Sequence, residues 1–292
     1  MNRAMKLIEC PRDAWQGLPN VIPTGAKAAY LRLLIELGFR HIDAVSFVSP
    51  KYVPQMADSE AVMAQIAPMV AETKTEIIGI VVNEQGFERA IKTPGVTTIG
   101  YPHSLSATFL ESNAHTTIER SRALISEFAA QAQTAGCGLV VYLSMAFGNP
   151  YGDPWSAARV AEEIAWLAET GVREISLADT VGLASPEEIR QLLQAVLPSL
   201  EGVEIGVHLH SRPESAAEKI LAAFEAGSRR SDSALTGLGG CPFAGDTMVG
   251  NLPTEIAVKT LKRRGEGTGI APTALVRALE ATHELRRLYA QG

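Results

Sequence analysis

The sequence predicts a (β/α)₈ TIM barrel with an additional C-terminal helix, which belongs to the α/β fold class. Eight short β-rich runs alternate with longer segments whose apolar residues recur at helical spacing, and parallel strands require such helical crossovers. The length of 292 residues suits one barrel, which needs about 250 residues. A doubly wound open sheet is the competing fold, but residues 10–17, after the first expected strand, lack a G-x-G-x-x-G fingerprint.

The expected strands are short, and each precedes a helical pattern. In chain order they cover residues 5–10, 41–47, 76–82, 96–101, 139–145, 174–178, 204–208 and 230–235. Ser185 followed by Pro186 indicates a helix start, because serine caps the exposed N–H groups and proline fits the first turn. Gly171, Gly202 and Gly227 each stand between a helical pattern and a strand, where helices commonly end.

Two further helical patterns, at residues 253–264 and 272–289, follow the eighth strand. No linker divides the chain, so we expect a single domain over residues 1–292. The barrel would span about residues 4–265 and the extra helix about residues 272–290. The apolar Leu275, Leu279 and Leu285 of that helix would cover either the barrel or a partner subunit, which leaves a homodimer or a higher homo-oligomer open.

Composition excludes several classes of protein. With 46% hydrophobic and 20% charged residues, the chain is neither disordered nor fibrous. A net charge of −6 gives no broad basic surface for nucleic acid, and no apolar run approaches the roughly 18 residues that cross a membrane. Three scattered cysteines are typical of a reducing compartment. We therefore expect a soluble, cytoplasmic protein with neither nucleic-acid nor membrane partners.

Two histidines end the seventh expected strand. Active-site groups of barrel enzymes gather at the carboxyl ends of the strands. Because a strand has a period of two, His208 and His210 lie on the same side and could hold half of a divalent-metal site. The alternative is that both histidines only pack the barrel mouth through hydrogen bonds.

Asp13 is the candidate third ligand. It follows the first strand, which neighbours the eighth in a closed barrel, so its carboxylate could face the two histidines. A mixed nitrogen and oxygen site of this kind suits Mg²⁺ or Mn²⁺, and Zn²⁺ fits the same ligand types. A salt bridge to Arg12 or a capping role in the loop is the other interpretation of Asp13.

A glycine-rich segment at residues 236–251 follows the eighth strand and contains Cys241. Its glycines could make the loop mobile or cradle a phosphate, and Cys241 could be a small apolar filler. We favour a reactive thiol, because an unperturbed thiol is mostly protonated at neutral pH and can donate a proton. Asn251, at the end of the segment, offers an amide oxygen to a hard metal.

Four separated motifs resemble the 3-hydroxy-3-methylglutaryl-CoA lyase family of metal-dependent barrel lyases. They are Glu9-Cys-Pro-Arg-Asp-Ala-Trp-Gln16, Ser46-Phe-Val-Ser-Pro-Lys-Tyr-Val-Pro-Gln-Met56, Gly206-Val-His-Leu-His210 and Gly237-Leu-Gly-Gly-Cys-Pro242. The similarity runs in matching order from about residue 6 to residue 260. It implies the same barrel and cleavage of the substrate into acetyl-CoA and acetoacetate.

The resemblance also implies a role for each matched residue. Asp13, His208, His210 and Asn251 would hold the divalent cation. Arg12, Asp13, Asp179 and Cys241 would be the catalytic residues, with Arg12 beside the carbonyl that becomes an enolate and Cys241 as the thiol of a mobile loop. Gln16, Asp43, Ser46 and Lys51 would lie around the substrate. Lys51 and Arg212 are also candidates for binding the CoA phosphates, from their loop positions.

The chain departs from the family at four places around the barrel mouth. Asp43 replaces a glutamate, Ser211-Arg-Pro-Glu214 replaces Asp-Thr-x-Gly, the cysteine loop is one residue longer, and Asn149 replaces a cysteine. We therefore expect the reaction type to persist and the accepted acyl group to be open to change. The alternatives are a lyase for another 3-hydroxyacyl-CoA or hydroxy acid, an acyl-CoA:2-oxoacid condensing enzyme, and a non-catalytic metal-binding barrel.

Overall fold

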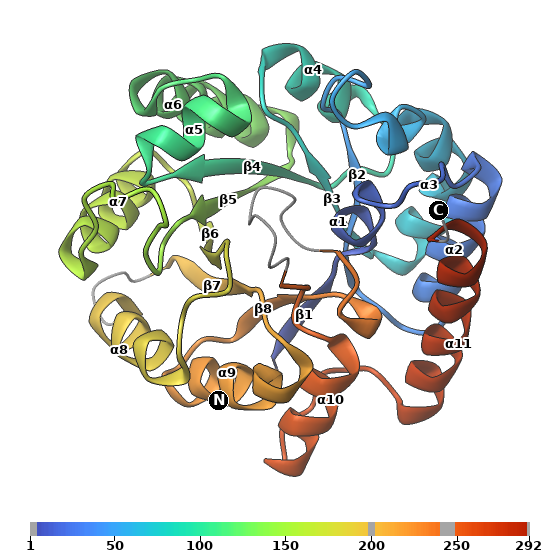
Figure 1. Ribbon diagram of the computed structural model, residues 1–292. Coiled ribbons are helices and arrows are strands. Elements are labelled where there is room, and N and C mark those ends of the chain that lie inside the picture. Colours follow the sequence, from blue (N-terminus) through green and yellow to red (C-terminus); the bar gives the residue numbers. More distant parts are fainter. Residues whose placement is uncertain (1–4, 198–201, 240–248, 291–292) are drawn as a thin grey trace.

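The computed structural model describes residues 5–197, 202–239 and 249–290, and within them eight parallel strands close into a barrel. Neighbouring strands pair in sequence order, and β1 pairs with β8 to close the ring (Figure 1). The strands are β1 (Lys6–Glu9), β2 (His41–Ser46), β3 (Glu76–Ile80), β4 (Thr98–Ser104), β5 (Gly138–Ser144), β6 (Glu174–Asp179), β7 (Glu204–Leu209) and β8 (Arg230–Ser233). The predicted fold class is confirmed.

Helices surround the barrel, and most lie between consecutive strands (Figure 1). They are α1 (Pro11–Gln16), α2 (Thr24–Glu36), α3 (Ser59–Thr73), α4 (Glu84–Lys92), α5 (Ala107–Ala114), α6 (Ile118–Ala135), α7 (Ala157–Glu169), α8 (Pro186–Val196), α9 (Pro213–Glu225), α10 (Thr254–Arg263) and α11 (Pro272–Tyr289). The helix α11 is the expected C-terminal addition. Leu275, Leu279 and Leu285 pack against the barrel's own core, and the Tyr30 hydroxyl of α2 lies 2.7 Å from the Thr282 Oγ1 of α11.

The punctuation of the helices follows the expected pattern. Ser185 forms a complete capping box with Glu188 at the start of α8, so two N–H groups of the helix end are satisfied. Gly171, Gly202 and Gly227 all have positive φ. A residue with a side chain is strained in that conformation, and this explains the glycine before each of these strands.

Two segments differ from the prediction. The fourth strand runs from Thr98 to Ser104 rather than over residues 96–101, because its polar end is buried: His103 is fully enclosed, with Nδ1 2.7 Å from the Ser121 hydroxyl and Nε2 3.0 Å from Glu163. Residues 11–16, for which the sequence predicts only a turn after the first strand, form the short helix α1. Pro11 occupies its first turn, where the missing N–H costs nothing.

No helix in the described part of the chain is long and apolar enough to cross a membrane.

Glu9 of β1 is a buried acid that faces away from the barrel axis. Its carboxylate accepts hydrogen bonds from the Leu235 N–H at 2.9 Å and from the Thr254 hydroxyl at 2.5 Å, so it joins both ends of the segment between β8 and α10. Burial raises the pKa of Glu9 to about 8, against these two hydrogen bonds, which lower it.

Replacing Glu9 by Gln is expected to change how stability depends on pH. Between pH 4.5 and about 8 the folded protein keeps a proton on Glu9 that the unfolded chain has released, so the free energy of unfolding falls as pH rises. Glu9→Gln removes this loss. As pH rises from 4.5 to about 8, the free energy of unfolding of the variant should increase relative to that of wild type by on the order of 2–4 kcal/mol. Urea unfolding at several pH values measures the difference. The exposed Glu111→Gln serves as a charge-matched control, and parallel pH profiles for Glu9→Gln and wild type would contradict the prediction.

Candidate active site

Two histidines lie at the carboxyl end of β7 with their rings close together. His208 and His210 have ring centroids 5.2 Å apart, as the two-residue period requires. His208 Nδ1–H donates to Asp232 Oδ2 at 3.1 Å, and His210 Nδ1–H donates to the Val249 carbonyl at 3.1 Å. Each ring is thus fixed through Nδ1, while neither Nε2 forms a hydrogen bond among the described residues.

The surroundings shift the pKa values of the two rings in opposite directions. Burial alone would lower the pKa of His208, but its contact with the Asp232 carboxylate outweighs burial and raises that pKa. Burial and the neighbouring ring of His208 lower the pKa of His210. His210 therefore favours the neutral form, in which Nε2 carries a lone pair.

The helix α1 brings together three of the side chains that the sequence analysis singles out. Arg12 and Gln16 are four residues apart and Asp13 and Gln16 three, so all three share one helix face. Arg12 Nη1 donates to Asp13 Oδ1 at 3.0 Å and to Gln16 Oε1 at 3.2 Å. The structure thus places these three predicted residues together, on a helix that begins just after β1.

Asp43 fixes the other side of the Arg12 guanidinium. It lies in the middle of β2 with no exposed surface, and it accepts a pair of hydrogen bonds from Arg12, with Nε to Oδ1 at 3.1 Å and a second bond from Nη2 to Oδ2. This two-point contact sets the plane of the guanidinium. Burial raises the pKa of Asp43, and Arg12 opposes that rise.

Asn251 connects α1 to the histidines. It forms an isolated bridge with His210, and its amide Nδ2 donates to Asp13 Oδ2 at 2.6 Å and to the Leu238 carbonyl at 3.0 Å. Gly239 must be glycine here, because a Cβ would lie 2.8 Å from the Asn251 Nδ2 and 2.9 Å from the Asp13 carbonyl oxygen. Asp13, His210 and Asn251 therefore meet at the barrel mouth.

The charge on Asp13 is well stabilised. Burial pushes the pKa of this carboxyl up, but Arg12 and the two histidines outweigh burial and hold it below the ordinary value. Asp13 is therefore an anion at neutral pH.

The donor chemistry of this cluster fits a divalent cation. Metal-binding histidines usually donate their second ring N–H to a carboxylate or a carbonyl, as His208 and His210 both do. Among the residues that the structure describes, no group of three His, Cys, Asp or Glu side chains is arranged to hold a metal ion. Asn251 also presents its amide nitrogen to Asp13, so a cation between them requires the amide to turn over.

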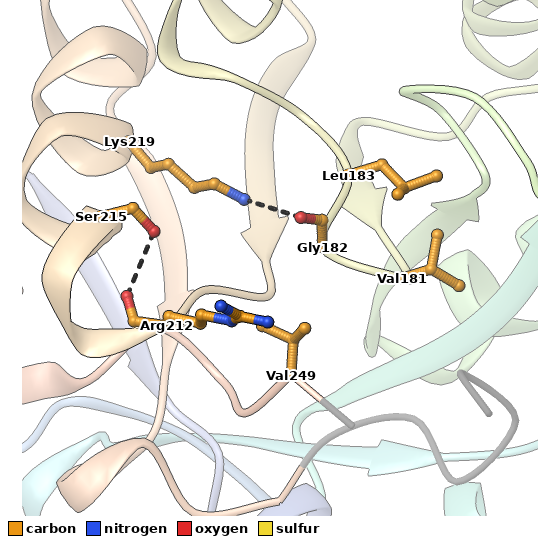
Figure 2. A pocket seen from close by; sticks show the side chains of 7 residues that line it. All are labelled: Val181, Gly182, Leu183, Arg212, Ser215, Lys219 and Val249. Carbon is orange, nitrogen blue, oxygen red and sulfur yellow. Dashed lines mark hydrogen bonds between the residues drawn. The ribbon is translucent and has the colours of Figure 1, made fainter. Parts of the chain in front are cut away.

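Asp179 ends β6 beside this cluster and is paired with a buried lysine. Lys219 of α9 donates from Nζ to Asp179 Oδ2 at 3.0 Å and to the His210 carbonyl at 2.9 Å. It also donates to the Gly182 carbonyl at 3.3 Å, as Figure 2 shows. The Ala184 N–H also donates to the Asp179 carboxylate at 3.2 Å. Lys219 thus connects the end of β6 to the backbone of His210.

The remaining predicted residues lie at different distances from the cluster. Ser46 ends β2 and is buried, with its hydroxyl accepting a hydrogen bond from the Val48 N–H. Lys51 lies on the exposed loop after β2, where its Nζ is 5.7 Å from the centre of the Tyr52 ring. Cys241 lies outside the described residues.

Sequence reasoning missed Asp232 and Lys219. Asp232 of β8 pairs in register with His208 of β7. Burial alone would raise the pKa of Asp232, but Arg230 and His208 outweigh burial and lower that pKa. The two-residue period could have identified Asp232, since it places this side chain on the inner face beside His208. No sequence spacing indicates Lys219, which reaches Asp179 only through the packing of α9 on the barrel.

Comparison with known proteins shows the family to which this chain belongs. A family model described as HMGL-like matches residues 5–282. The mitochondrial hydroxymethylglutaryl-CoA lyase of Mus musculus is 35% identical over 277 residues, which cover 94% of this chain and 84% of that protein.

Two solved structures show the same similarity across nearly the whole chain. HMG-CoA lyase from Brucella melitensis has a TM-score of 0.88 and 32% identity, and the match covers 98% of this chain and 99% of that one. HMG-CoA lyase from Acinetobacter baumannii, solved with coenzyme A and 3-methylmalate, has a TM-score of 0.88 and 30% identity, with coverage of 97% and 91%. The chain therefore belongs to the HMGL-like family.

Proposed function

We propose that the protein is a carbon–carbon lyase that cleaves 3-hydroxy-3-methylglutaryl-CoA, or a close analogue, into acetyl-CoA and acetoacetate. The observation that carries this proposal is the meeting of Arg12 and Asp13 with two histidines whose Nδ1 atoms are both fixed. Membership of the HMGL-like family and the neighbour solved with coenzyme A support an acyl-CoA substrate.

Asp13, His208, His210 and Asn251 are the proposed holders of a divalent cation, Mg²⁺ or Mn²⁺. Oxygen and imidazole donors suit these ions, and Zn²⁺ fits the same set. Such a cation, when bound, lowers the pKa of the substrate's tertiary hydroxyl, as it does for water. The Asp13 carboxylate would take up that hydroxyl proton only weakly, because its pKa is already held low.

Arg12 is the proposed stabiliser of the enolate. Cleavage of the bond between C2 and C3 moves an electron pair onto the thioester carbonyl, whose oxygen becomes negative. A guanidinium already held by Asp43 and Asp13 meets that oxygen without reorganising during the reaction. The enolate carbon then needs a proton, and the Cys241 thiol is the proposed donor.

Gln16, Ser46 and Lys51 complete the proposed substrate contacts. Gln16 donates from Nε2 to Asp13 at 3.3 Å and so lies beside the reacting atoms. Ser46 lies at the end of β2, three residues along the strand from Asp43. Lys51 is on the exposed rim, where an ammonium could contact a phosphate of CoA.

A coupled assay tests this function. Purified protein with Mg²⁺ or Mn²⁺ should release acetyl-CoA and acetoacetate in equal amounts from 3-hydroxy-3-methylglutaryl-CoA, and a chelator should abolish turnover. A panel of other hydroxyacyl thioesters and free hydroxy acids, and the reverse condensation, covers the alternatives. Turnover that is indifferent to chelation would exclude the metal-dependent mechanism.

Asp232→Asn is expected to weaken metal binding about 10- to 100-fold, because Asp232 fixes the orientation of the His208 ring. Calorimetric titration with Mn²⁺ measures the affinity, and circular dichroism checks that the barrel is intact. Glu127→Gln, which alters an exposed carboxylate on α6, is the control. An unchanged affinity in Asp232→Asn would contradict the role of this carboxylate.

A cytoplasmic location is also our proposal. Cys10 and Cys137 are free thiols, which a reducing compartment maintains. Fractionation of cells that produce the protein would test it.

A further inference from the structure

A cavity of about 290 Å³ lies between the loop after β6 and the start of α9. Figure 2 shows Val181 and Leu183 on one side of it, with Ser215 and Lys219 on the other. The cavity adjoins the active site: Lys219 Nζ donates to the His210 carbonyl at 2.9 Å. A ligand in this space would therefore be separated from His210, one of the proposed metal ligands, by the side chain of Lys219.

The lining of the cavity is positive. Among the described residues that line it, Arg212 and Lys219 are charged and none is acidic. Lys219 is buried and neutralised by Asp179, so its charge is already satisfied. The Arg212 guanidinium is exposed and forms no ion pair with any carboxylate in the described part of the chain. Arg212 is therefore available to bind an anion, and a guanidinium matches a carboxylate or a phosphate through two parallel hydrogen bonds.

Apolar side chains form the rest of the wall. Val181, Leu183 and Val249 line the cavity, and Leu183 is 60% exposed. Such a surface loses contact with water when it covers the carbon stem of a ligand. The space thus suits a short carbon arm that ends in an anionic group.

We propose that this cavity is an anion subsite of the lyase, in which Arg212 binds a carboxylate carried on an acyl arm larger than the methyl group of 3-hydroxy-3-methylglutaryl-CoA. The proposal rests on the proposed function and specifies its substrate class as branched 3-hydroxyacyl thioesters with an additional carboxylate. A phosphate of CoA has the same chemistry. The acyl arm is favoured because two residues that line the cavity, Lys219 and Val249, are hydrogen-bonded to His210, whereas the long pantetheine arm holds the phosphates far from the reacting carbon.

The first test compares two thioesters of equal size. One carries a 2-carboxyethyl group in place of the 3-methyl group, and the other carries the corresponding neutral amide. Wild type should prefer the acid about 10- to 100-fold in kcat/KM, the range of a charge-assisted hydrogen bond. Arg212→Gln should lose this preference. Arg286→Gln removes the same charge from the exposed face of α11, and this control variant should keep the preference for the acid.

The second test separates the two sources of the anion. One outcome would assign Arg212 to a CoA phosphate and show that the acyl-arm assignment is wrong. In it, Arg212→Gln slows cleavage of 3-hydroxy-3-methylglutaryl-CoA but not of the corresponding pantetheine thioester, and it lowers kcat/KM equally for the acid and amide arms. If the variant changes none of these ratios, the subsite itself is refuted.

A binding measurement tests the anion subsite separately from the proposed lyase activity. Calorimetric titration of wild type and Arg212→Gln with the acid and amide thioesters measures the preference without turnover. A wild-type protein that binds the acid more tightly but cleaves no thioester would support the subsite while refuting the proposed lyase. Equal affinities for acid and amide in wild type would refute the subsite even in an active enzyme.

Discussion

His208→Ala is expected to remove both metal binding and catalysis. The imidazole at this position is fixed by Asp232 and leaves Nε2 without a hydrogen-bond partner among the described residues, as a metal ligand requires. Loss of the cation leaves the substrate hydroxyl at its ordinary acidity, so we expect kcat/KM to fall by at least about 10³-fold. Metal content by mass spectrometry and acetyl-CoA release measure the two effects together.

His283→Ala is the matched control, because His283 lies on the exposed face of α11 and the substitution is the same. It should retain the metal content and the activity of wild type. A His208→Ala protein that loses activity but binds Mn²⁺ with wild-type affinity would contradict the ligand assignment.

Arg12→Gln is expected to lower kcat by about 10²- to 10³-fold while the protein still binds the cation, because the amide cannot supply the positive charge that the enolate oxygen requires. The kcat of Arg12→Lys should lie between those of Arg12→Gln and wild type, because lysine keeps the charge but loses the two-point contact with Asp43. Steady-state kinetics of both variants measure the loss of kcat, and titration with Mn²⁺ measures whether the cation still binds.

The stability of the Arg12 variants needs its own measurement, since the substitution leaves Asp43 buried without its cation. Thermal unfolding shows whether the assays are made on folded protein. Activity of a folded Arg12→Gln protein within a factor of about three of wild type would refute the proposed role of Arg12.

The sequence predicts the barrel because its two periodicities are local. A strand shows a period of two and a helix a period of 3.6, and all eight expected strands overlap the observed ones. The paired histidines follow from the same rule. The rule did not predict the end of β4, because His103 and Ser104 are polar, as loop residues usually are. Only the folded structure shows Ser121 and Glu163 packed against that end.

Contacts between distant segments are what the sequence does not predict. Lys219 meets Asp179 only because α9 packs against the end of β6, and the residues are 40 positions apart. Arg230 is another example: it lies inside the barrel with no exposed surface, and the absence of a side chain at Gly206 makes room for it. Neither pairing has a fixed spacing along the chain, so each requires the folded structure.

The central claim is that Asp13, His208 and His210 converge on one cation, and a crystal grown with Mn²⁺ tests it most directly. Anomalous diffraction should show one strong peak at about 2.0–2.3 Å from an Asp13 carboxylate oxygen and from the Nε2 atoms of both histidines. A well-ordered structure in which Mn²⁺ binds elsewhere, or in which these three side chains diverge with no ion able to contact them together, would contradict the account.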